Sequence, residues 1–267
     1  MNLFNHFPVT SDLQKCDGIN GPELSKKPTL DLWIDQEDQH QHKLSLAMIC
    51  RLLLDGIPAC YITLSRDADA IKNTMISTLC SVPHFWLEKV VDGSSGLVDC
   101  ETIEKVKKAQ KLVEKLLFVV DMSDESDCYF EKIRHHCEEA AERFCSVIFL
   151  DKLEDVRFFE EKSHELVKPG NAIYHLKKIV ADLNLLVICL TSKIEVELDL
   201  EERICHSEFR SINTLPDRIF IFSKRLERKS KKGSYHYNVE THDLVNRNTI
   251  CFWLKILDNL RFAKSER

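Results

Sequence analysis

Short apolar runs alternate with longer amphipathic segments along most of the chain. Their lengths and their content of β-branched residues are typical of strands that are buried on both faces of a sheet. The runs lie at residues 30–34, 59–64, 116–121, 146–151, 185–191 and 218–222. Strands that alternate with helices predict an α/β fold, with a mostly parallel central sheet and helices on both of its faces.

Two of the segments between these runs have the pattern of helices. Residues 43–54 (KLSLAMICRLLL) follow the first run closely, and residues 127–144 begin with Asp127, a residue type that often caps helix N-termini. In the second segment, apolar residues recur at spacings of three and four, at Phe130, Ile133, Cys137, Ala141 and Phe144. This spacing predicts a helix with one buried face.

The two ends of the chain differ from this pattern. Residues 1–28 combine polar residues with scattered prolines and glycines, which is the composition of a flexible N-terminal arm. We expect one domain over residues 29–267, because a 267-residue chain with 44% hydrophobic content can bury one substantial core. Residues 235–262 hold two further strand-like pieces, which predict a C-terminal antiparallel hairpin at the edge of the sheet.

Charge and cysteine content limit the class of protein. The formal net charge is -6 and the pI is near 6.0, so a nucleic-acid contact would need a local basic patch. The eleven cysteines occur singly, without a CxxC pair, which favours a reducing cytoplasm. No run approaches the roughly 20 apolar residues of a membrane-spanning helix, so we expect a cytoplasmic protein without a membrane partner.

The residues that end the predicted strands are candidates for chemistry, because parallel sheets bind ligands at the carboxyl ends of their strands. They are Asp35, Ser65, Asp121, Asp151 and Ser192. Asp151 closes the run SVIFLD, the pattern of a Walker B aspartate that holds the magnesium of a bound nucleotide. The alternative is a structural turn, because aspartate often starts turns.

The stretch WIDQEDQHQHKLSLAMIC, residues 33–50, joins the first predicted strand to the first helix and contains no glycine. A phosphate-binding loop at this place needs glycines, because its backbone adopts positive φ angles and aims amide groups at phosphates. Lys43 takes the position of the lysine of such a loop. The alternative is that Lys43 is a solvated residue in the first turn of a helix.

Taken in order, these segments resemble the motor domain of the DnaB family of bacterial replicative DNA helicases. DLWIDQEDQHQHKLSLAM is similar to the strand, phosphate loop and helix that open that domain, and GIPACYITLSRD to its next strand. SVIFLDKLEDV resembles the Walker B strand, and LKKIVADLNLLVICLTSK resembles the helix and strand before the family's sensor. SEFRSI, DRIFIFSKR, LVNRNT and LDNLRF resemble later segments, so the likeness spans about residues 29–264.

The resemblance implies a RecA-like domain, related to P-loop NTPases, with a degenerate Walker A loop. The positions that keep the family's chemistry form a nucleotide-binding remnant at Lys43, Ser45, Asp151 and Arg247. Elsewhere the family's residue is replaced, with His42 for the last loop glycine, Leu44 for the magnesium-binding threonine, Ser65 for the catalytic glutamate, Ser192 for the sensor glutamine and Val245 for the finger lysine. We therefore assign no catalytic residue, metal ligand or cofactor, and leave weak binding of ATP and magnesium open.

The function that this resemblance implies is that of a pseudoenzyme in DNA replication, a helicase relative that does not hydrolyse ATP. Its partners would be a replicative helicase, another replication protein, a second copy of itself or single-stranded DNA. The alternative is an ATP-dependent DNA helicase subunit whose residual nucleotide binding is completed by neighbouring subunits.

One local feature favours nucleic acid as a partner. Residues 223–237 are expected to form a hairpin loop, and they concentrate basic residues at Lys224, Arg225, Arg228, Lys229, Lys231 and Lys232. Such a cluster can neutralise phosphates, and the aromatic residues that follow can stack on bases. The alternative is a solvated surface loop, and the acidic residues 193–203 oppose DNA binding where the family's central loop lies.

Histidines supply two further candidates. His40 and His42 lie among acidic residues, but no distant cysteine or histidine pair completes a metal site with them. His135 and His136 fall in the predicted helix 127–144, where adjacent residues are not expected to face the same partner. We interpret this pair as surface histidines.

Overall fold

The structure is a computed structural model. It describes residues 28–35, 41–64, 66–91, 98–122, 130–151, 169–191, 216–224, 234–244, 248–257 and 262–263.

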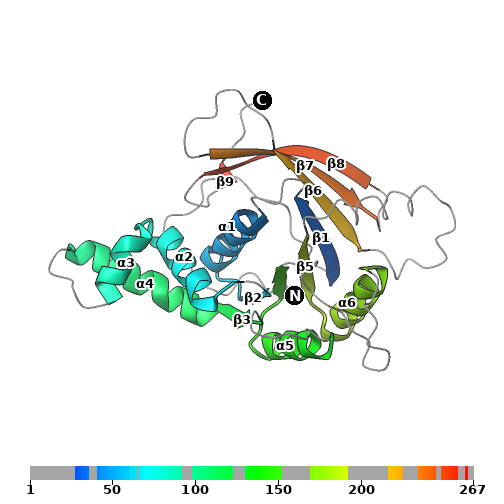
Figure 1. Ribbon diagram of the computed structural model, residues 1–267, viewed down its shortest axis with the longest axis horizontal. Helices are drawn as coiled ribbons and strands as arrows, with labels where there is room; N and C mark the ends of the chain where they lie inside the picture. Colours follow the sequence, from blue (N-terminus) through cyan, green and yellow to red (C-terminus); the bar gives the residue numbers. More distant parts are fainter. Residues whose placement is uncertain are drawn as a thin grey trace.

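The described strands form one sheet of nine, in the order β3-β2-β4-β5-β1-β6-β7-β8-β9 (Figure 1). The first six strands are parallel: β1 (Thr29–Asp35), β2 (Ala59–Thr63), β3 (Leu117–Asp121), β4 (Val147–Asp151), β5 (Leu186–Thr191) and β6 (Arg218–Lys224). The sheet continues antiparallel with β7 (Ser234–Asp243), β8 (Asn248–Leu257) and β9 (Phe262–Ala263). β7 and β8 lie in the region where the sequence predicts the hairpin.

Helices cover both faces of the parallel part of the sheet. They are α1 (Gln41–Leu54), α2 (Ala68–Cys80), α3 (His84–Val91), α4 (Cys100–Leu116), α5 (Phe130–Glu142) and α6 (Pro169–Leu183). The first four pack with one face of the sheet, and α5 and α6 pack with the other. The prediction of a mostly parallel sheet with helices on both faces is therefore confirmed.

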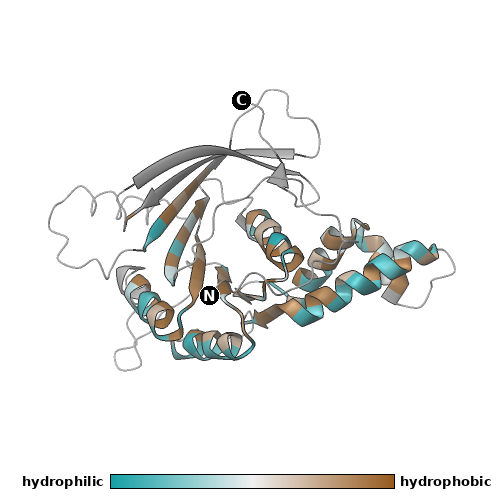
Figure 2. Ribbon diagram, turned by 180° about the vertical axis from the view of Figure 1, so that it is seen from behind, coloured by the Kyte–Doolittle hydropathy of each residue, from teal (hydrophilic) through white to brown (hydrophobic). Residues whose placement is uncertain are grey.

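The apolar runs are apolar at every position because successive strand residues point to opposite, equally buried faces. In β4, Val147 and Phe149 belong to the core shared with α1, whereas Ile148 and Leu150 belong to the core shared with α5 and α6. Figure 2 shows the consequence: the central strands are mainly brown, whereas α4 and α5 alternate between brown and teal.

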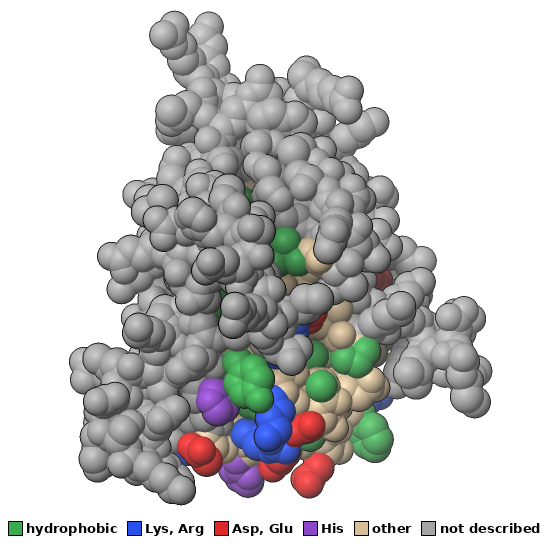
Figure 3. Space-filling view, turned by 90° about the vertical axis from the view of Figure 1, so that its right-hand side faces the viewer, with side chains coloured by type: hydrophobic (Ala, Val, Ile, Leu, Met, Phe, Trp, Pro, Cys, Tyr) green, Lys and Arg blue, Asp and Glu red, His purple; other side chains and the backbone are tan. Residues whose placement is uncertain are grey.

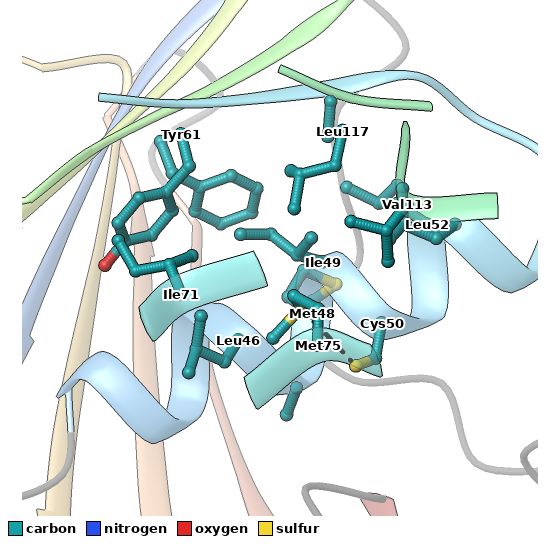
Figure 4. Close-up of a cluster of buried hydrophobic side chains, with 14 of the residues drawn as sticks. Leu46, Met48, Ile49, Cys50, Leu52, Tyr61, Ile71, Met75, Val113 and Leu117 are labelled. Carbon is teal, nitrogen blue, oxygen red and sulfur yellow. Dashed lines mark hydrogen bonds between the residues drawn. The ribbon is translucent and has the colours of Figure 1, made fainter. Parts of the chain in front are cut away.

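The core on the first face is built around α1. Residues 44–50 of this helix are all buried, as expected for a helix that is surrounded by protein. Leu46 and Ile49 pack with Met75 of α2 and Val113 of α4 (Figure 4). The chain turns away from the helix at Gly56, whose φ of 74° is the positive value that only glycine adopts without cost. The packing fixes α1 firmly against the sheet.

The helix expected at residues 127–144 ends earlier than predicted. α5 begins at Phe130 and ends at Glu142, and Asp127 lies outside the described residues. Ile133 and Cys137 are buried as predicted, but Phe144 is 85% exposed. The assignment of Phe144 to the buried face is wrong, because its φ of 62° places it beyond the helix, in the position that terminates it.

Candidate functional site

The carboxyl end of β4 meets the start of α1. Asp151 is the last residue of β4 and is 1% exposed. Lys43 is half-buried in the first turn of α1. The residue before it, His42, brings its Nδ1 atom to 3.9 Å from Asp151 Oδ2. The fold therefore brings together the two elements that the sequence predicts to carry the nucleotide-binding remnant.

The carboxylate of Asp151 accepts a hydrogen bond from the hydroxyl of Tyr61, at 2.6 Å between Oη and Oδ2. Tyr61 lies directly opposite Phe149 in the parallel ladder of β2 and β4, and the two rings stack with centroids 6.4 Å apart. Asp151 is two positions further along β4 on the same face, within diagonal reach of a phenol. Figure 4 shows the Tyr61 hydroxyl at the margin of the apolar cluster.

His42 extends this network to α1. Its Nδ1 atom lies 3.1 Å from the Tyr61 hydroxyl. Because the single phenolic hydrogen goes to Asp151, Nδ1 of His42 carries the hydrogen and donates it to Tyr61. Burial, with the charge of Arg66 as a second cause, lowers the pKa of His42 from 6.5 to about 3. His42 is therefore neutral at pH 7, and its approach to Asp151 is not an ion pair.

Arg66 supplies a positive charge opposite the buried carboxylate. Its Nε atom lies 3.5 Å from Asp151 Oδ2, and its side chain is 40% exposed. The backbone amide of Arg66 donates to the Thr63 hydroxyl at 3.0 Å, which fixes the chain just beyond β2. A guanidinium carries a permanent charge, so Arg66 compensates part of the cost of burying Asp151.

Two positions of α1 that the resemblance relates to magnesium binding face the protein interior. Leu44 is 2% exposed and belongs to the core around α1. Ser45 is fully buried, and its hydroxyl donates to the carbonyl of His42 at 2.9 Å. Ser45 also lies beside the Tyr61 hydroxyl. Its place is thus within the internal network of the protein.

Tyr61 keeps its hydrogen at physiological pH. Burial raises the pKa of Tyr61 well above its usual value of 10, and the negative charge of Asp151 acts in the same direction. A phenol that stays protonated is a permanent donor to the carboxylate. The described part of the site is therefore a hydrogen-bonded network centred on the Tyr61 hydroxyl rather than an activated base or nucleophile.

Several predicted site residues cannot be placed in this geometry. Those outside the described residues are Ser65, Ser192, Val245, Arg247, Arg225, Arg228, Lys229, Lys231, Lys232 and the acidic segment 193–203. Lys224 is the last residue of β6, but its side chain is outside the described set. Their proposed roles stay predictions.

Among the described residues, no group of three or more His, Cys, Asp or Glu side chains could hold a metal ion. His40 and its acidic neighbours lie outside them. His135 and His136 share one partner: Glu139 lies 2.9 Å from His136 Nδ1 and 3.8 Å from His135 Nε2. The expectation that adjacent helical residues face different partners is wrong here, because a long carboxylate one turn further along reaches both rings.

The described surface on the side of α6 carries charges of both signs. Figure 3 shows Lys or Arg, Asp or Glu, and His side chains close to exposed hydrophobic ones on this side. Arg134 bonds Glu138 on its own helix and Asp182 of α6. A surface of this kind is not the single-sign patch that binds nucleic acid. In the parts of the chain that the structure describes, no helix is long and apolar enough to cross a membrane.

Sequence reasoning did not identify Tyr61 or Arg66 as site residues. Tyr61 stands inside an apolar run and reads as core. The alternation of strand residues was the signal that could have found it, because it places Tyr61 and Asp151 on the α1 face once β2 and β4 are paired in register.

Comparison with known proteins identifies the fold. No protein-family model and no curated protein matches the chain. The chain is similar in structure to a solved ATPase domain, with a TM-score of 0.63, 14% identity, and coverage of 90% of this chain and 86% of that one. It is also similar to a DnaB-like replicative helicase solved in a study of its interactions with primase, with a TM-score of 0.63 and 15% identity.

The second match covers 90% of this chain but 58% of the helicase chain. The chain therefore spans little more than half the length of that helicase. These likenesses show a RecA-like fold of the kind found in DnaB-like helicase ATPase domains. The resemblance drawn from the sequence is confirmed at the level of the fold.

Proposed function

We propose that the chain is a non-hydrolysing relative of helicase motor domains, a pseudoenzyme that acts in DNA replication. Residues 29–267 would form its single RecA-like domain, preceded by the arm 1–28. Its partners would be a replicative helicase or another replication protein, a second copy of the chain, or single-stranded DNA. The fold likeness supports the choice of this class, and the site supports the loss of hydrolysis.

The observation that carries this proposal is the state of Asp151. A Walker B carboxylate works when it is open to a hydrated magnesium ion. Here the Tyr61 hydroxyl occupies Oδ2 at 2.6 Å, and the Arg66 guanidinium lies 3.5 Å from the same oxygen. At this oxygen, protein groups thus take the place of a metal-bound water and a positive charge.

A second candidate is an ATP-dependent helicase subunit whose site is completed by neighbours. The proximity of the α1 start to Asp151 favours it, because that geometry is the one a nucleotide site requires. The two candidates differ in whether the chain hydrolyses ATP.

ATP turnover by the purified chain, with and without single-stranded DNA, tests the proposal. We expect no hydrolysis above background in either condition. Lys43→Ala serves as the control for contaminating ATPases, because it removes only the remnant lysine. A DNA-stimulated rate that disappears in Lys43→Ala would contradict the proposal and establish the helicase subunit.

A further inference from the structure

We propose that Tyr61 is an internal substitute for a nucleotide and its cation, and fixes the start of α1 to the sheet without any ligand. This inference rests on the proposed function, because it concerns the same site. It goes further by assigning a positioning role to one hydroxyl group and by predicting how the site responds to nucleotide.

The Tyr61 hydroxyl is the point where three elements meet. Tyr61 belongs to β2, its hydroxyl donates to Asp151 of β4 at 2.6 Å, and it accepts from His42 of α1 at 3.1 Å. The three residues are far apart in sequence: Tyr61 and Asp151 are separated by 90 positions, and His42 and Tyr61 by 19. One phenol therefore joins segments that only the fold brings together.

These bonds are costly to open. Tyr61 and Asp151 are 0% and 1% exposed, so water cannot readily replace either partner. A buried polar group that loses its partner pays its full desolvation cost. The Tyr61 ring is also fully buried and stacked on Phe149, and such close packing restricts its movement.

The network also supplies the negative charge that the start of a helix favours. The first turn of α1 contains no acidic residue. The partial positive charge of a helix N-terminus attracts anions, including phosphates. The carboxylate of Asp151, 3.9 Å from the His42 ring in that turn, meets this need from within the protein.

A ligand shifts a conformational equilibrium only by binding one state more tightly than another. If Tyr61 already holds α1 in place, magnesium and nucleotide have no looser state to order. The start of α1 should then be equally rigid with and without them, and should loosen when the hydroxyl is removed.

Hydrogen exchange followed by mass spectrometry tests this inference. In Tyr61→Phe, which keeps the stacked ring, we expect exchange in peptides covering residues 41–50 to rise about tenfold, the effect of losing one buried hydrogen bond. Peptides of α4 should exchange at the wild-type rate, which separates local loosening from general destabilisation. Tyr174→Phe, at a tyrosine that is 45% exposed, is the matched control and should change nothing.

His42→Ala supplies a second variant if Tyr61→Phe does not fold. It removes the donor that links α1 to Tyr61 but leaves the bond between Tyr61 and Asp151, so faster exchange should be confined to α1. Wild-type exchange rates in Tyr61→Phe, or in His42→Ala if that variant is used, would overturn the inference. So would protection of α1 in the wild type by magnesium and ATP.

The outcomes separate this inference from the proposed function. A chain without ATP turnover, in which Tyr61→Phe leaves α1 unchanged, keeps the proposed function and overturns the role of Tyr61. A chain that hydrolyses ATP overturns the proposed function and the role of Tyr61 as a substitute for nucleotide. If Tyr61→Phe loosens α1 in such a chain, only the positioning role of the hydroxyl is kept.

Discussion

His42 shows how far a single buried side chain can depart from its ordinary chemistry. Its ring is held between Tyr61 and the start of α1, and burial together with Arg66 lowers its pKa to about 3. In an unfolded chain a histidine takes up its proton near pH 6.5. The unfolded state therefore binds more protons than the folded state between about pH 3 and 6.5.

This difference makes stability depend on pH with a defined sign. The contribution of His42 is fully present above pH 6.5 and is lost as the pH falls toward 3, with about 2 kcal/mol lost by pH 5. We expect His42→Gln to remove this loss, so that the stability difference between wild type and variant changes by that amount between pH 7 and pH 5. Urea denaturation at several pH values measures the free energy of unfolding of both proteins.

His135→Gln is the matched control, because the His135 side chain is 67% exposed. Its pH profile should differ from that of the wild type by less than the profile of His42→Gln does. Equal profiles for wild type and His42→Gln would show that His42 titrates normally in the folded state.

The site around His42 shows which features can be predicted from the sequence and which cannot. The places of Lys43 and Asp151 in the fold could be predicted, because Lys43 lies in the first turn of a helix and Asp151 ends a strand, and both elements have a visible apolar pattern. The contacts of Tyr61, His42 and Arg66 with Asp151 could not, because they depend on which strands are neighbours and in which register. β2 and β4 pair although β3 lies between them in sequence.

At the scale of elements, charged side chains join β1, β6 and α6 away from the Asp151 site. Asp31 of β1 is fully buried and accepts hydrogen bonds on both carboxylate oxygens from Arg218, its direct partner on β6. The neighbouring Asp217 binds Lys177 of α6, at 2.9 Å, and the backbone amide of Leu30. Two ion pairs, between Asp31 and Arg218 and between Asp217 and Lys177, thus accompany the parallel pairing of β1 with β6.

Burial raises the pKa of Asp31 from 3.8 to about 6, and Arg218 only partly opposes this. The folded state therefore binds this proton more tightly than the unfolded state, and its contribution to stability falls as the pH rises from 3.8 to about 6. Removing Arg218 should leave a buried charge without compensation. We expect Arg218→Met to cost about 3–5 kcal/mol at pH 8.

The loss should be smaller at pH 5, where Asp31 takes up a proton and needs no cation. Adding Asp31→Asn to Arg218→Met should restore much of the stability at pH 8. Urea denaturation of the two variants at both pH values gives their free energies of unfolding and tests both expectations. A loss that does not depend on pH, or additive losses in the double variant, would show that the two side chains act independently.

Element boundaries were predicted less well than element types. The spacing of Ile133 and Cys137 gives α5 its buried face, but the same spacing wrongly carried the helix on to Phe144. Hydrophobic spacing cannot show where the backbone turns to positive φ. That turn depends on the hydrogen bonds of the last helical turn, such as that from Phe144 N to Ala141 O.

For the whole molecule, the alternation of strands and helices was enough to predict the fold class. Each apolar run of the parallel strands places apolar side chains on both faces of the sheet. Helices must therefore cover both faces, and few other folds fit this pattern. What the pattern cannot supply is a partner. The basic residues 224–232 remain the sequence feature that gives the most specific expectation of a partner, namely single-stranded DNA.

If that loop binds single-stranded DNA, affinity should fall steeply with salt, because each neutralised phosphate releases counterions. Replacing Arg228, Lys229, Lys231 and Lys232 by alanine should weaken binding and flatten the salt slope by up to about 3. Fluorescence anisotropy with a labelled single strand measures both. If the wild type shows no binding at low salt, or if the variant binds as tightly as the wild type, the loop is not a DNA contact.

The central claim is that Tyr61 and Arg66 occupy Oδ2 of Asp151 in place of a hydrated cation. Isothermal titration of ATP into the wild type, with and without magnesium, tests it directly, and Asp151→Asn is the control. We expect no magnesium-dependent binding up to about 1 mM nucleotide, which corresponds to less than about 4 kcal/mol of binding free energy. Magnesium-dependent binding in the wild type that disappears in Asp151→Asn would contradict the claim.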